Sequence, residues 1–154
     1  RHGLWTALND DRSDIIATDH APHTKEEKMN PYTKAPSGGP MVQHALSVLL
    51  ESHLQGKISI EKIVEKMAHN PAKLFDIDQR GFVREGYFAD LVLVDMDAPY
   101  TVSKENILYK CGWSPLEGQR FRSRVTQSIV NGVLTYDNGV FSSGSAAMAV
   151  KFKR

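Results

Sequence analysis

An acidic residue and two histidines follow directly on a short apolar run near the start of the chain. The stretch covers residues 14–18, with Ile15, Ile16 and Ala17 between Asp14 and Thr18. Asp19, His20 and His23 come after it. A carboxylate offers hard oxygen lone pairs to a divalent metal, and an imidazole titrates near neutral pH. This group could therefore bind a metal ion or move protons. The plain alternative is that Asp19 caps a helix and that the histidines are ordinary polar residues of a loop.

The apolar run predicts a buried strand, because it is short, rich in isoleucine and bounded by polar residues. Pro22 cannot continue the hydrogen-bond ladder of a strand. We therefore expect Asp19, His20 and His23 at the end of that strand, which is where α/β barrels keep their catalytic side chains.

Two helices should follow. Apolar residues recur at helical spacing from Met41 to Leu54, with Pro40 at the entry and Gly56 at the exit. Ser59 should cap a second helix that runs to about Ala68. In this helix we expect a buried side formed by Ile60, Ile63, Val64 and Met67, and a solvent-facing side formed by Glu61, Glu65 and Lys66. Asn70-Pro71 should break the helical pattern, with one more helical turn over residues 72–75.

Beyond Gly81 the pattern changes to short runs that favour strands. Asn131-Gly132 and Asn138-Gly139 are dipeptides typical of hairpin turns. These signals predict a small β-domain after the helices. The expected strands cover residues 82–83, 91–94, 100–102, 125–130 and 133–136.

The sequences of several segments resemble those of the dihydroorotases, which are cyclic amidohydrolases related to allantoinase and dihydropyrimidinase. The Asp-His-Ala-Pro-His sequence at 19–23 is the most particular of these matches. The others occur in the family's order and cover nearly the whole chain. Residues 14–24 resemble the last barrel strand, 34–40 an Ala-Pro-x-Gly loop, 69–75 an Asn-Pro-Ala-x-x-Phe turn, 86–95 a Gly-x-x-Ala-Asp-Leu-Val-Leu strand, and 110–118 and 129–132 the closing segments.

The resemblance implies an α/β fold that is the end of a (β/α)₈ metal-dependent hydrolase barrel followed by part of a small β-sandwich. Residues 1–80 would be the barrel portion and residues 81–154 the sandwich portion. A complete barrel needs on the order of 250 residues, whereas this chain has 154 and begins with Arg1. We therefore interpret the chain as the C-terminal portion of a longer protein.

By family position, Asp19 would be both a metal ligand and the catalytic proton shuttle. It would take a proton from the attacking hydroxide and deliver it to the departing amide nitrogen. His23 would bind the carboxylate of the substrate, and Ser37 and Gly38 would lie against the substrate ring. His20 is expected to pack behind the site and to orient the loop. Ser37 departs from the aromatic residue that many bacterial dihydroorotases carry at this point, which leaves room for a different substrate.

The implied cofactor is zinc, as one or two ions. The family holds the metal with a His-x-His pair, a bridging carboxylate and two further histidines, and no His-x-His occurs in this sequence. Even a catalytic zinc site normally takes three protein ligands. Asp19 cannot hold zinc by itself, so we expect the segment alone to be inert.

The resemblance implies the reversible hydrolysis of (S)-dihydroorotate to N-carbamoyl-L-aspartate in pyrimidine biosynthesis. One alternative is a cyclic amidase of the allantoinase or hydantoinase type. Another is an inactive dihydroorotase-like subunit that supports assembly. The resemblance further implies three partners, which are a small-molecule substrate, a second copy in a homodimer and aspartate carbamoyltransferase.

Composition excludes other classes of function. The net charge of +1 and the 24% share of charged residues give no sign of a nucleic-acid surface, and no apolar run is long enough to span a membrane. A single cysteine, Cys111, excludes an internal disulfide and favours a cytoplasmic location.

Several remaining residues have structural interpretations. Trp113, with Cys111 and Pro115, should form a packing cluster in the β-domain. The mixed charges at 25–28 should form a solvated loop. The histidines at 44, 53 and 69 should be solvated or satisfied by packing.

Overall fold

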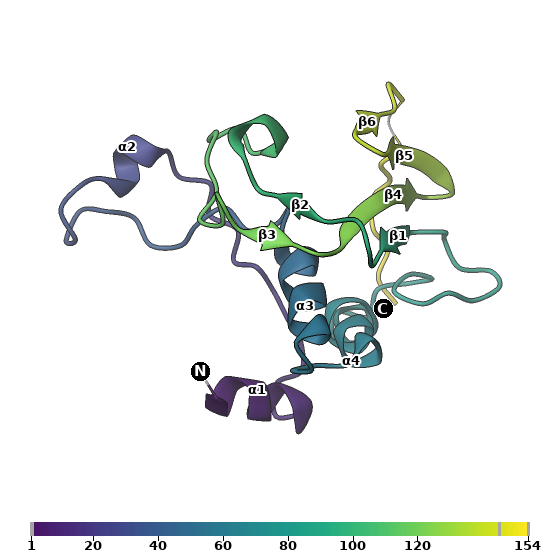
Figure 1. Ribbon diagram of the computed structural model, residues 1–154. Helices are drawn as coiled ribbons and strands as arrows, with labels where there is room; N and C mark the ends of the chain where they lie inside the picture. The colour runs from purple at the N-terminus through teal and green to yellow at the C-terminus, as the bar shows by residue number, and fades with distance from the viewer. Residues whose placement is uncertain (1, 145, 154) are drawn as a thin grey trace.

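The computed structural model describes residues 2–144 and 146–153, in which helices come first and antiparallel strands follow (Figure 1). Helix α3 lies centrally, with a long loop that carries α2 on one side and the larger sheet on the other (Figure 1). The helices are α1 (His2–Asn9), α2 (Lys25–Lys28), α3 (Ala45–Leu54), α4 (Ile60–Val64), the π-helix η1 (Glu65–His69), α5 (Asn70–Leu74) and the 3₁₀-helix η2 (Lys104–Asn106).

The strands form two antiparallel sheets. One has the order β1-β4-β5-β6 and the other pairs β2 with β3. The bounds are β1 (Leu91–Asp95), β2 (Tyr100–Thr101), β3 (Arg120–Phe121), β4 (Arg124–Val130), β5 (Val133–Asp137) and β6 (Val140–Phe141). Near the C-terminus, Ile77 and Phe152 form an isolated antiparallel bridge.

The two expected hairpin turns are confirmed. Asn131 and Gly132 have φ angles of 51° and 80° and connect β4 to β5, and Asn138 and Gly139, at 46° and 98°, connect β5 to β6. Two consecutive residues with positive φ suit the tight turns whose twist matches that of paired strands. Residues 82–83 form no strand, so that expectation is wrong.

The helix expected over 41–54 is confirmed from Ala45 onward. Ser59 caps the next helix as predicted, because its hydroxyl oxygen accepts the Lys62 N–H at 3.1 Å. The predicted break at Asn70-Pro71 is wrong, because the chain stays helical from η1 into α5. The Asn70 N–H donates to the Glu65 carbonyl, five residues back, and this wider π-turn accommodates the proline.

The predicted buried face is wrong in part. Ile60 and Val64 are 39% and 41% exposed, whereas Lys66, expected in water, is 1% exposed. Lys66 lies three residues after the buried Ile63 and therefore on the same side of the helix, where its ammonium meets Asp11. The expectation for Ile63 holds, since it is buried in the core.

The core joins the helices to the strands. Leu49 and Leu50 of α3 pack with Ile58 and Ile63, and partly buried side chains close around them. Those side chains come from both halves of the chain and are Trp5, Leu8, Ile16, Leu46, Met67, Val94 and Met96.

The segment expected to be a buried strand, residues 14–18, forms no strand in the described part of the chain. The Ile16 N–H donates to the Lys66 carbonyl at 3.0 Å, and the first bridge comes at His20, which pairs in parallel with Gly39. A strand requires a neighbour along its length to receive its ladder of hydrogen bonds, and the described residues supply one at a single point.

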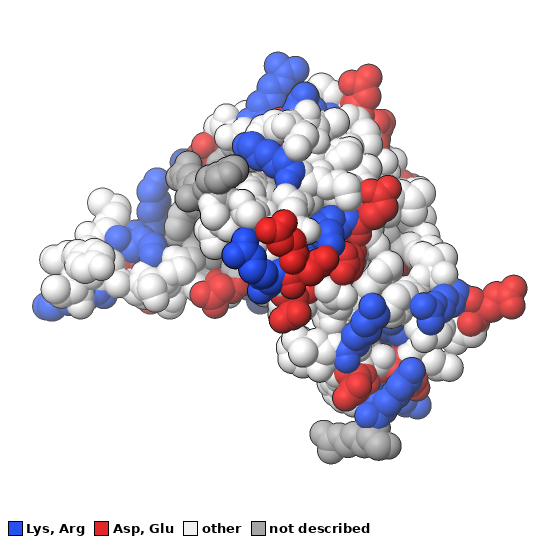
Figure 2. Space-filling view, turned by 90° about the horizontal axis from the view of Figure 1, so that it is seen from below, with Lys and Arg blue, Asp and Glu red and all other residues white. Residues whose placement is uncertain are grey.

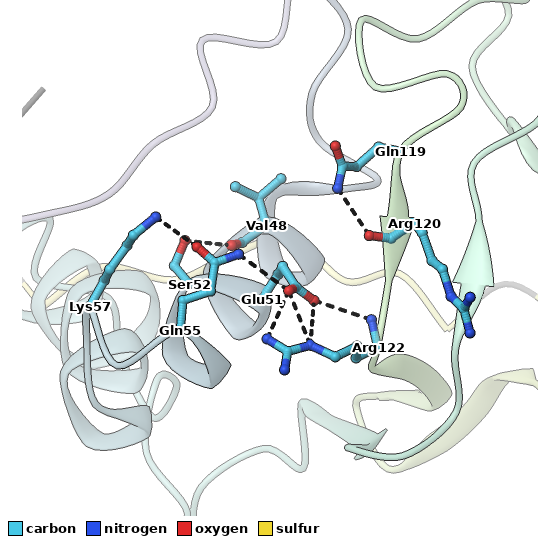
Figure 3. Close-up of polar contacts among 8 residues, drawn as sticks. All are labelled: Val48, Glu51, Ser52, Gln55, Lys57, Gln119, Arg120 and Arg122. Atoms are coloured by element: carbon cyan, nitrogen blue, oxygen red, sulfur yellow. Dashed lines mark hydrogen bonds and ion pairs between the residues drawn. The ribbon is translucent and has the colours of Figure 1, made fainter.

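A bidentate ion pair also connects the helical part of the chain to the strands. The Glu51 carboxylate on α3 accepts hydrogen bonds from Arg122 Nε at 3.1 Å and Nη2 at 2.9 Å, and from the Arg122 backbone N–H at 3.2 Å (Figure 3). These bonds hold the pKa of Glu51 below its usual value. The pair sets α3 against the turn between β3 and β4.

Charged side chains of both signs lie next to one another on the face shown in Figure 2. Asp11, which follows α1, forms ion pairs with two lysines. Asp11 Oδ1 lies 2.7 Å from Lys62 Nζ and 2.9 Å from the buried Lys66 Nζ. Hydrogen bonds from Lys62 and then Lys66 lower the pKa of Asp11 from 3.8 to about 2.

Within the residues described, no helix is long and apolar enough to cross a membrane.

The Asp11 contacts predict a loss of stability in acid. Asp11 binds its proton more weakly in the folded chain, so its contribution to stability is complete above pH 3.8 and disappears as the pH falls through about 2. Asp11→Asn should remove this part of the pH dependence and should destabilise the protein at neutral pH, since it leaves the Lys66 ammonium buried without its counterion. Urea unfolding from pH 2 to 7 measures both effects. Asp10→Asn, next to it in sequence, is the control, and equal pH profiles for the two variants would contradict the prediction.

Gly81 should not tolerate a side chain. Its φ is +79°, and an added Cβ would lie 2.4 Å from Ala72 Cβ and 2.8 Å from the Ala68 carbonyl oxygen. Gly86 has the same φ of +79° with no atom within 4 Å of such a Cβ. Gly81→Ala should therefore lower the free energy of unfolding by about 2 kcal/mol more than Gly86→Ala does. Equal losses in chemical unfolding would show that backbone conformation, not the close approach, decides the cost.

Candidate active site

Asp19 sits where the extended segment ends. Its backbone has a φ of 44°, in the left-handed region that non-glycine residues rarely adopt. Its side chain is exposed, and within residues 2–144 and 146–153 its carboxylate accepts no hydrogen bond. A strained backbone that presents a free carboxylate is typical of a functional position.

Backbone contacts bring a second predicted segment beside Asp19. His20 pairs with Gly39, and the Ala21 N–H donates to the Gly39 carbonyl at 3.1 Å. Gly38 has a φ of +80°, and a Cβ on it would lie 2.7 Å from Ala21 Cβ and 3.8 Å from the Asp19 carbonyl oxygen. Only glycine permits this approach. The structure therefore places the backbone at Asp19 beside the backbone at Gly38, although the two residues are well separated in the sequence.

His20 anchors the same loop by its side chain. Its Nδ1 accepts the backbone N–H of Met41 at 3.1 Å and that of Val42 at 3.4 Å. The ring therefore orients the entry to α3, as expected of a residue that packs behind a site. With Nδ1 occupied as an acceptor, the remaining ring nitrogen carries the proton.

His23 lies just before the short helix α2. Its ring is partly exposed, with Nδ1 3.6 Å from the Glu27 carboxylate, and its backbone carbonyl accepts a hydrogen bond from Trp113 Nε1 at 2.8 Å. Glu27 also accepts the Thr24 N–H at 2.8 Å in a capping box. A histidine with one nitrogen beside an acid and the other free can donate to an anionic ligand.

Ser37 is exposed in the loop next to Gly38, and its hydroxyl makes no hydrogen bond to any residue that the structure describes. The loop itself is held by Lys28, whose Nζ donates to the carbonyls of Pro36 at 2.5 Å and Gly38 at 2.9 Å. The prediction of a solvated loop over residues 25–28 is therefore wrong, because these residues form helix α2 and Lys28 binds the neighbouring loop. Nothing in the local pattern signals a lysine that binds carbonyls eight and ten residues away.

Trp113 is the other residue that sequence reasoning misplaced. It was expected to pack in the β-domain, but its indole N–H binds His23 and its ring edge comes within 4.0 Å of the Cβ position of Gly39. The hydrogen bond spans 90 residues of sequence. A long-range contact of this kind leaves no trace in composition or periodicity.

A buried polar cluster lies behind these loops. His44 is fully buried, with Nδ1 3.1 Å from Tyr109 Oη and 3.4 Å from Ser114 Oγ, and its Nε2 has no partner among the described residues. Burial lowers the pKa of His44, so its ring stays neutral. Of the other helix histidines, His69 stacks on Phe82 at 4.3 Å and His53 Nδ1 lies 3.0 Å from the Ile58 carbonyl oxygen.

The described residues do not complete a metal centre. They contain no cluster of three or more histidine, cysteine or acidic side chains that could hold an ion. Asp19 can supply one hard oxygen ligand, and a catalytic zinc needs about three protein ligands. Among the described residues, Asp19 is therefore the one ligand that the sequence predicts, and it does not make a zinc site by itself.

A groove lies elsewhere on the molecule. A groove of about 600 Å³ lies between α3 and the four-stranded sheet, and Leu46, Tyr100 and Tyr136 are among its lining residues. None of the predicted site residues lines it. The candidate site is thus an open surface formed by two adjacent loops.

Comparison with known proteins agrees with the sequence resemblance. Dihydroorotase of Clostridium acetobutylicum is 37% identical over 139 residues, which is 90% of this chain and 32% of that protein. Dihydroorotase of Halobacterium salinarum is 42% identical over 118 residues, which is 77% of this chain and 28% of that protein. The chain thus spans about a third of the length of the curated relatives it matches.

A solved structure shares the fold. D-Hydantoinase (dihydropyrimidinase) from a Thermus species superposes with a TM-score of 0.86 at 25% identity, over 94% of this chain and 33% of that one. The family model described as "Amidohydrolase family" matches residues 1–135, which include Asp19, His23 and the loop of Ser37 and Gly38. By this match over most of its length, the chain belongs to the amidohydrolase family.

Proposed function

We propose that this chain is the C-terminal part of a dihydroorotase, which hydrolyses (S)-dihydroorotate reversibly to N-carbamoyl-L-aspartate. The observation that carries the proposal is the contact between the Asp19–His23 segment and the loop of Ser37 and Gly38. This contact lies in a chain that is 37% and 42% identical to two dihydroorotases. The two segments that carry the predicted site residues thus lie side by side.

In this proposal Asp19 carries the proton. Its carboxylate is exposed, and no described group donates a hydrogen bond to it, so an oxygen is free to accept a proton from the water that attacks the ring carbonyl. The same oxygen can then deliver that proton to the amide nitrogen as the C–N bond breaks. No net proton is gained or lost, because the proton removed from the nucleophile protonates the leaving nitrogen.

His23, Ser37 and Gly38 would bind the substrate. The free edge of the His23 ring would donate to the substrate carboxylate, while Glu27 lies on its Nδ1 side. Gly38 has no side chain to block approach, so the backbone of its loop can reach the ring amide. Ser37 adds an exposed hydroxyl beside it.

Zinc, as one or two ions, is the proposed cofactor. Asp19 would be one of its ligands, and the others would come from parts of the whole protein beyond this chain. A bound zinc ion would supply Lewis-acid polarisation of the carbonyl and a lowered pKa of water.

The finer fold assignment belongs to the same proposal. Residues 1–80 would close a (β/α)₈ barrel, with residues 14–18 as its last strand once neighbouring strands are present, and residues 81–154 would form part of a β-sandwich. The TM-score of 0.86 with D-hydantoinase supports this placement. A homodimer in the cytoplasm, and association with aspartate carbamoyltransferase, remain expectations from the family resemblance.

A hydantoinase activity is the second candidate. The structural match to D-hydantoinase favours it, and Ser37 is compatible with a different substrate. The identity to that enzyme is 25%, however, against 37% and 42% for the two dihydroorotases. We therefore place dihydroorotase first.

Asp19 should be essential in the whole protein. Asp19→Asn keeps the shape of the side chain but removes its ability to take up a proton, so kcat should fall by at least about 100-fold. Steady-state dihydroorotate hydrolysis measures the loss. Asp14→Asn, which changes another exposed carboxylate five residues earlier, is the matched control and should keep kcat within about 2-fold. An active Asp19→Asn enzyme would refute the assigned role, and a zinc-free, inactive wild type would indicate an assembly subunit.

His23 should distinguish the two candidate substrates. If it binds the carboxylate, His23→Ala should raise KM for dihydroorotate by about 10-fold or more, the cost of one charge-assisted hydrogen bond. The KM for hydantoin, which lacks a carboxylate, should change little. KM values for both substrates test this. A wild type that turns over hydantoin much faster than dihydroorotate, or equal effects of the substitution on both, would favour the hydantoinase.

A further inference from the structure

The segment 109–114 contacts both loops of the candidate site. Trp113 Nε1 donates to the His23 carbonyl at 2.8 Å, on the loop that carries Asp19. Tyr109 Oη accepts the Gln43 N–H at 3.1 Å, at the end of the loop that carries Ser37 and Gly38. One short piece of chain therefore holds two loops that are separate in sequence.

The contacts end on backbone N–H groups in the turn that precedes α3. The Ala45 N–H, the first of the helix, binds the Met41 carbonyl at 3.1 Å, so the donors of residues 41–43 lie outside the helix. Before α3, the N–H groups of Met41 and Val42 bind His20 Nδ1, and that of Gln43 binds Tyr109. The rings of His20 and Tyr109 are themselves in contact, with centroids 5.3 Å apart. The two side chains therefore act together on one turn of backbone.

The Tyr109 hydroxyl is fixed from behind. Tyr109 is buried, and its Oη lies 3.1 Å from Nδ1 of the fully buried His44. The Gln43 side chain adds two bonds to the same region, since its Nε2 donates to the Asn106 carbonyl at 2.7 Å and its Oε1 accepts the Leu108 N–H at 2.8 Å. The segment is therefore a fixed support and not a loose covering loop.

We infer that Tyr109 and Trp113 are positioning residues, which set the spacing between the loop of Asp19 and His23 and the loop of Ser37 and Gly38. The inference rests on the proposed function, because it assumes that a substrate lies between these loops. A cyclic substrate gripped from two sides requires both loops to be placed within a fraction of an ångström. Neither Tyr109 nor Trp113 needs to touch the substrate for this role.

The test uses the whole protein with Tyr109→Phe, which removes one hydroxyl and keeps the ring. Loss of the hydroxyl's two hydrogen bonds, to the Gln43 N–H and to His44 Nδ1, should let the turn at 41–44 shift and raise KM for dihydroorotate by about 3- to 10-fold. The kcat should change less than about 2-fold, because Asp19 is held by other contacts, and the zinc content should stay the same. Amide hydrogen exchange in residues 41–44 should become faster, since the Gln43 N–H loses its acceptor.

Trp113→Phe is the second variant. It keeps an aromatic ring but removes the N–H that binds the His23 carbonyl, so exchange should rise around residues 23–25 and KM should increase in the same way. Tyr87→Phe is the matched control. It removes a hydroxyl from a tyrosine that packs on Phe82, away from both loops, and should leave KM and the exchange of both loops unchanged.

Two kinds of result overturn the inference. One is a fall in the midpoint of thermal unfolding of Tyr109→Phe with unchanged KM and unchanged exchange at 41–44, which would make the residue structural. The other is an equal effect of Tyr87→Phe. An active wild type with these results refutes the positioning role but keeps the proposed function. An inactive wild type refutes the proposed function, and unchanged exchange in both loops then also refutes the support by segment 109–114.

Discussion

The candidate site depends on how the N–H groups before α3 are satisfied. Residues 41–43 precede the helix, and their N–H groups donate to the side chains of His20 and Tyr109. His20 is the neighbour of Asp19, so the hydrogen bonds that hold the turn before α3 also hold the residue next to the catalytic acid of the proposed enzyme. The entry to α3 and the candidate site therefore share the same contacts.

Helix α3 transmits this constraint to the rest of the molecule. Its Leu49 and Leu50 form the core with Ile58 and Ile63, and side chains from β1 close over them. On another side, Glu51 holds Arg122 in a bidentate pair between β3 and β4 (Figure 3). Apolar packing and an ion pair therefore hold the helix in place, and the loops of the candidate site are attached at its N-terminal end.

In the proposed enzyme, the two loops would form one side of the active site. Asp19 is free and lies on a strained backbone, Gly38 allows a close approach, and His23 and the loop at 36–38 are tied by Trp113 and Lys28. The metal ligands that would complete the centre are not among the described residues. The chain spans about a third of the length of its curated relatives.

Local physics in the sequence determined a large part of the fold. Apolar spacing predicted α3, the Ser59 hydroxyl predicted the start of α4, and two Asn-Gly pairs predicted the hairpins, because each feature acts within a few residues. The motif of Asp19 and His23 likewise indicated the amidohydrolase family, which the family match confirms.

Tertiary structure decided what depends on distant partners. Lys66 is buried with its ammonium on Asp11, which lies far away in the sequence. Lys28 supports the site through a carbonyl ten residues away, and Tyr109 and Trp113 do so through backbone groups 66 and 90 residues away. Residues 14–18 have strand composition but form no strand, since a ladder needs a neighbour that the described residues do not supply. A backbone N–H or carbonyl is the same at every position, so no residue pattern can say which distant side chain will bind it.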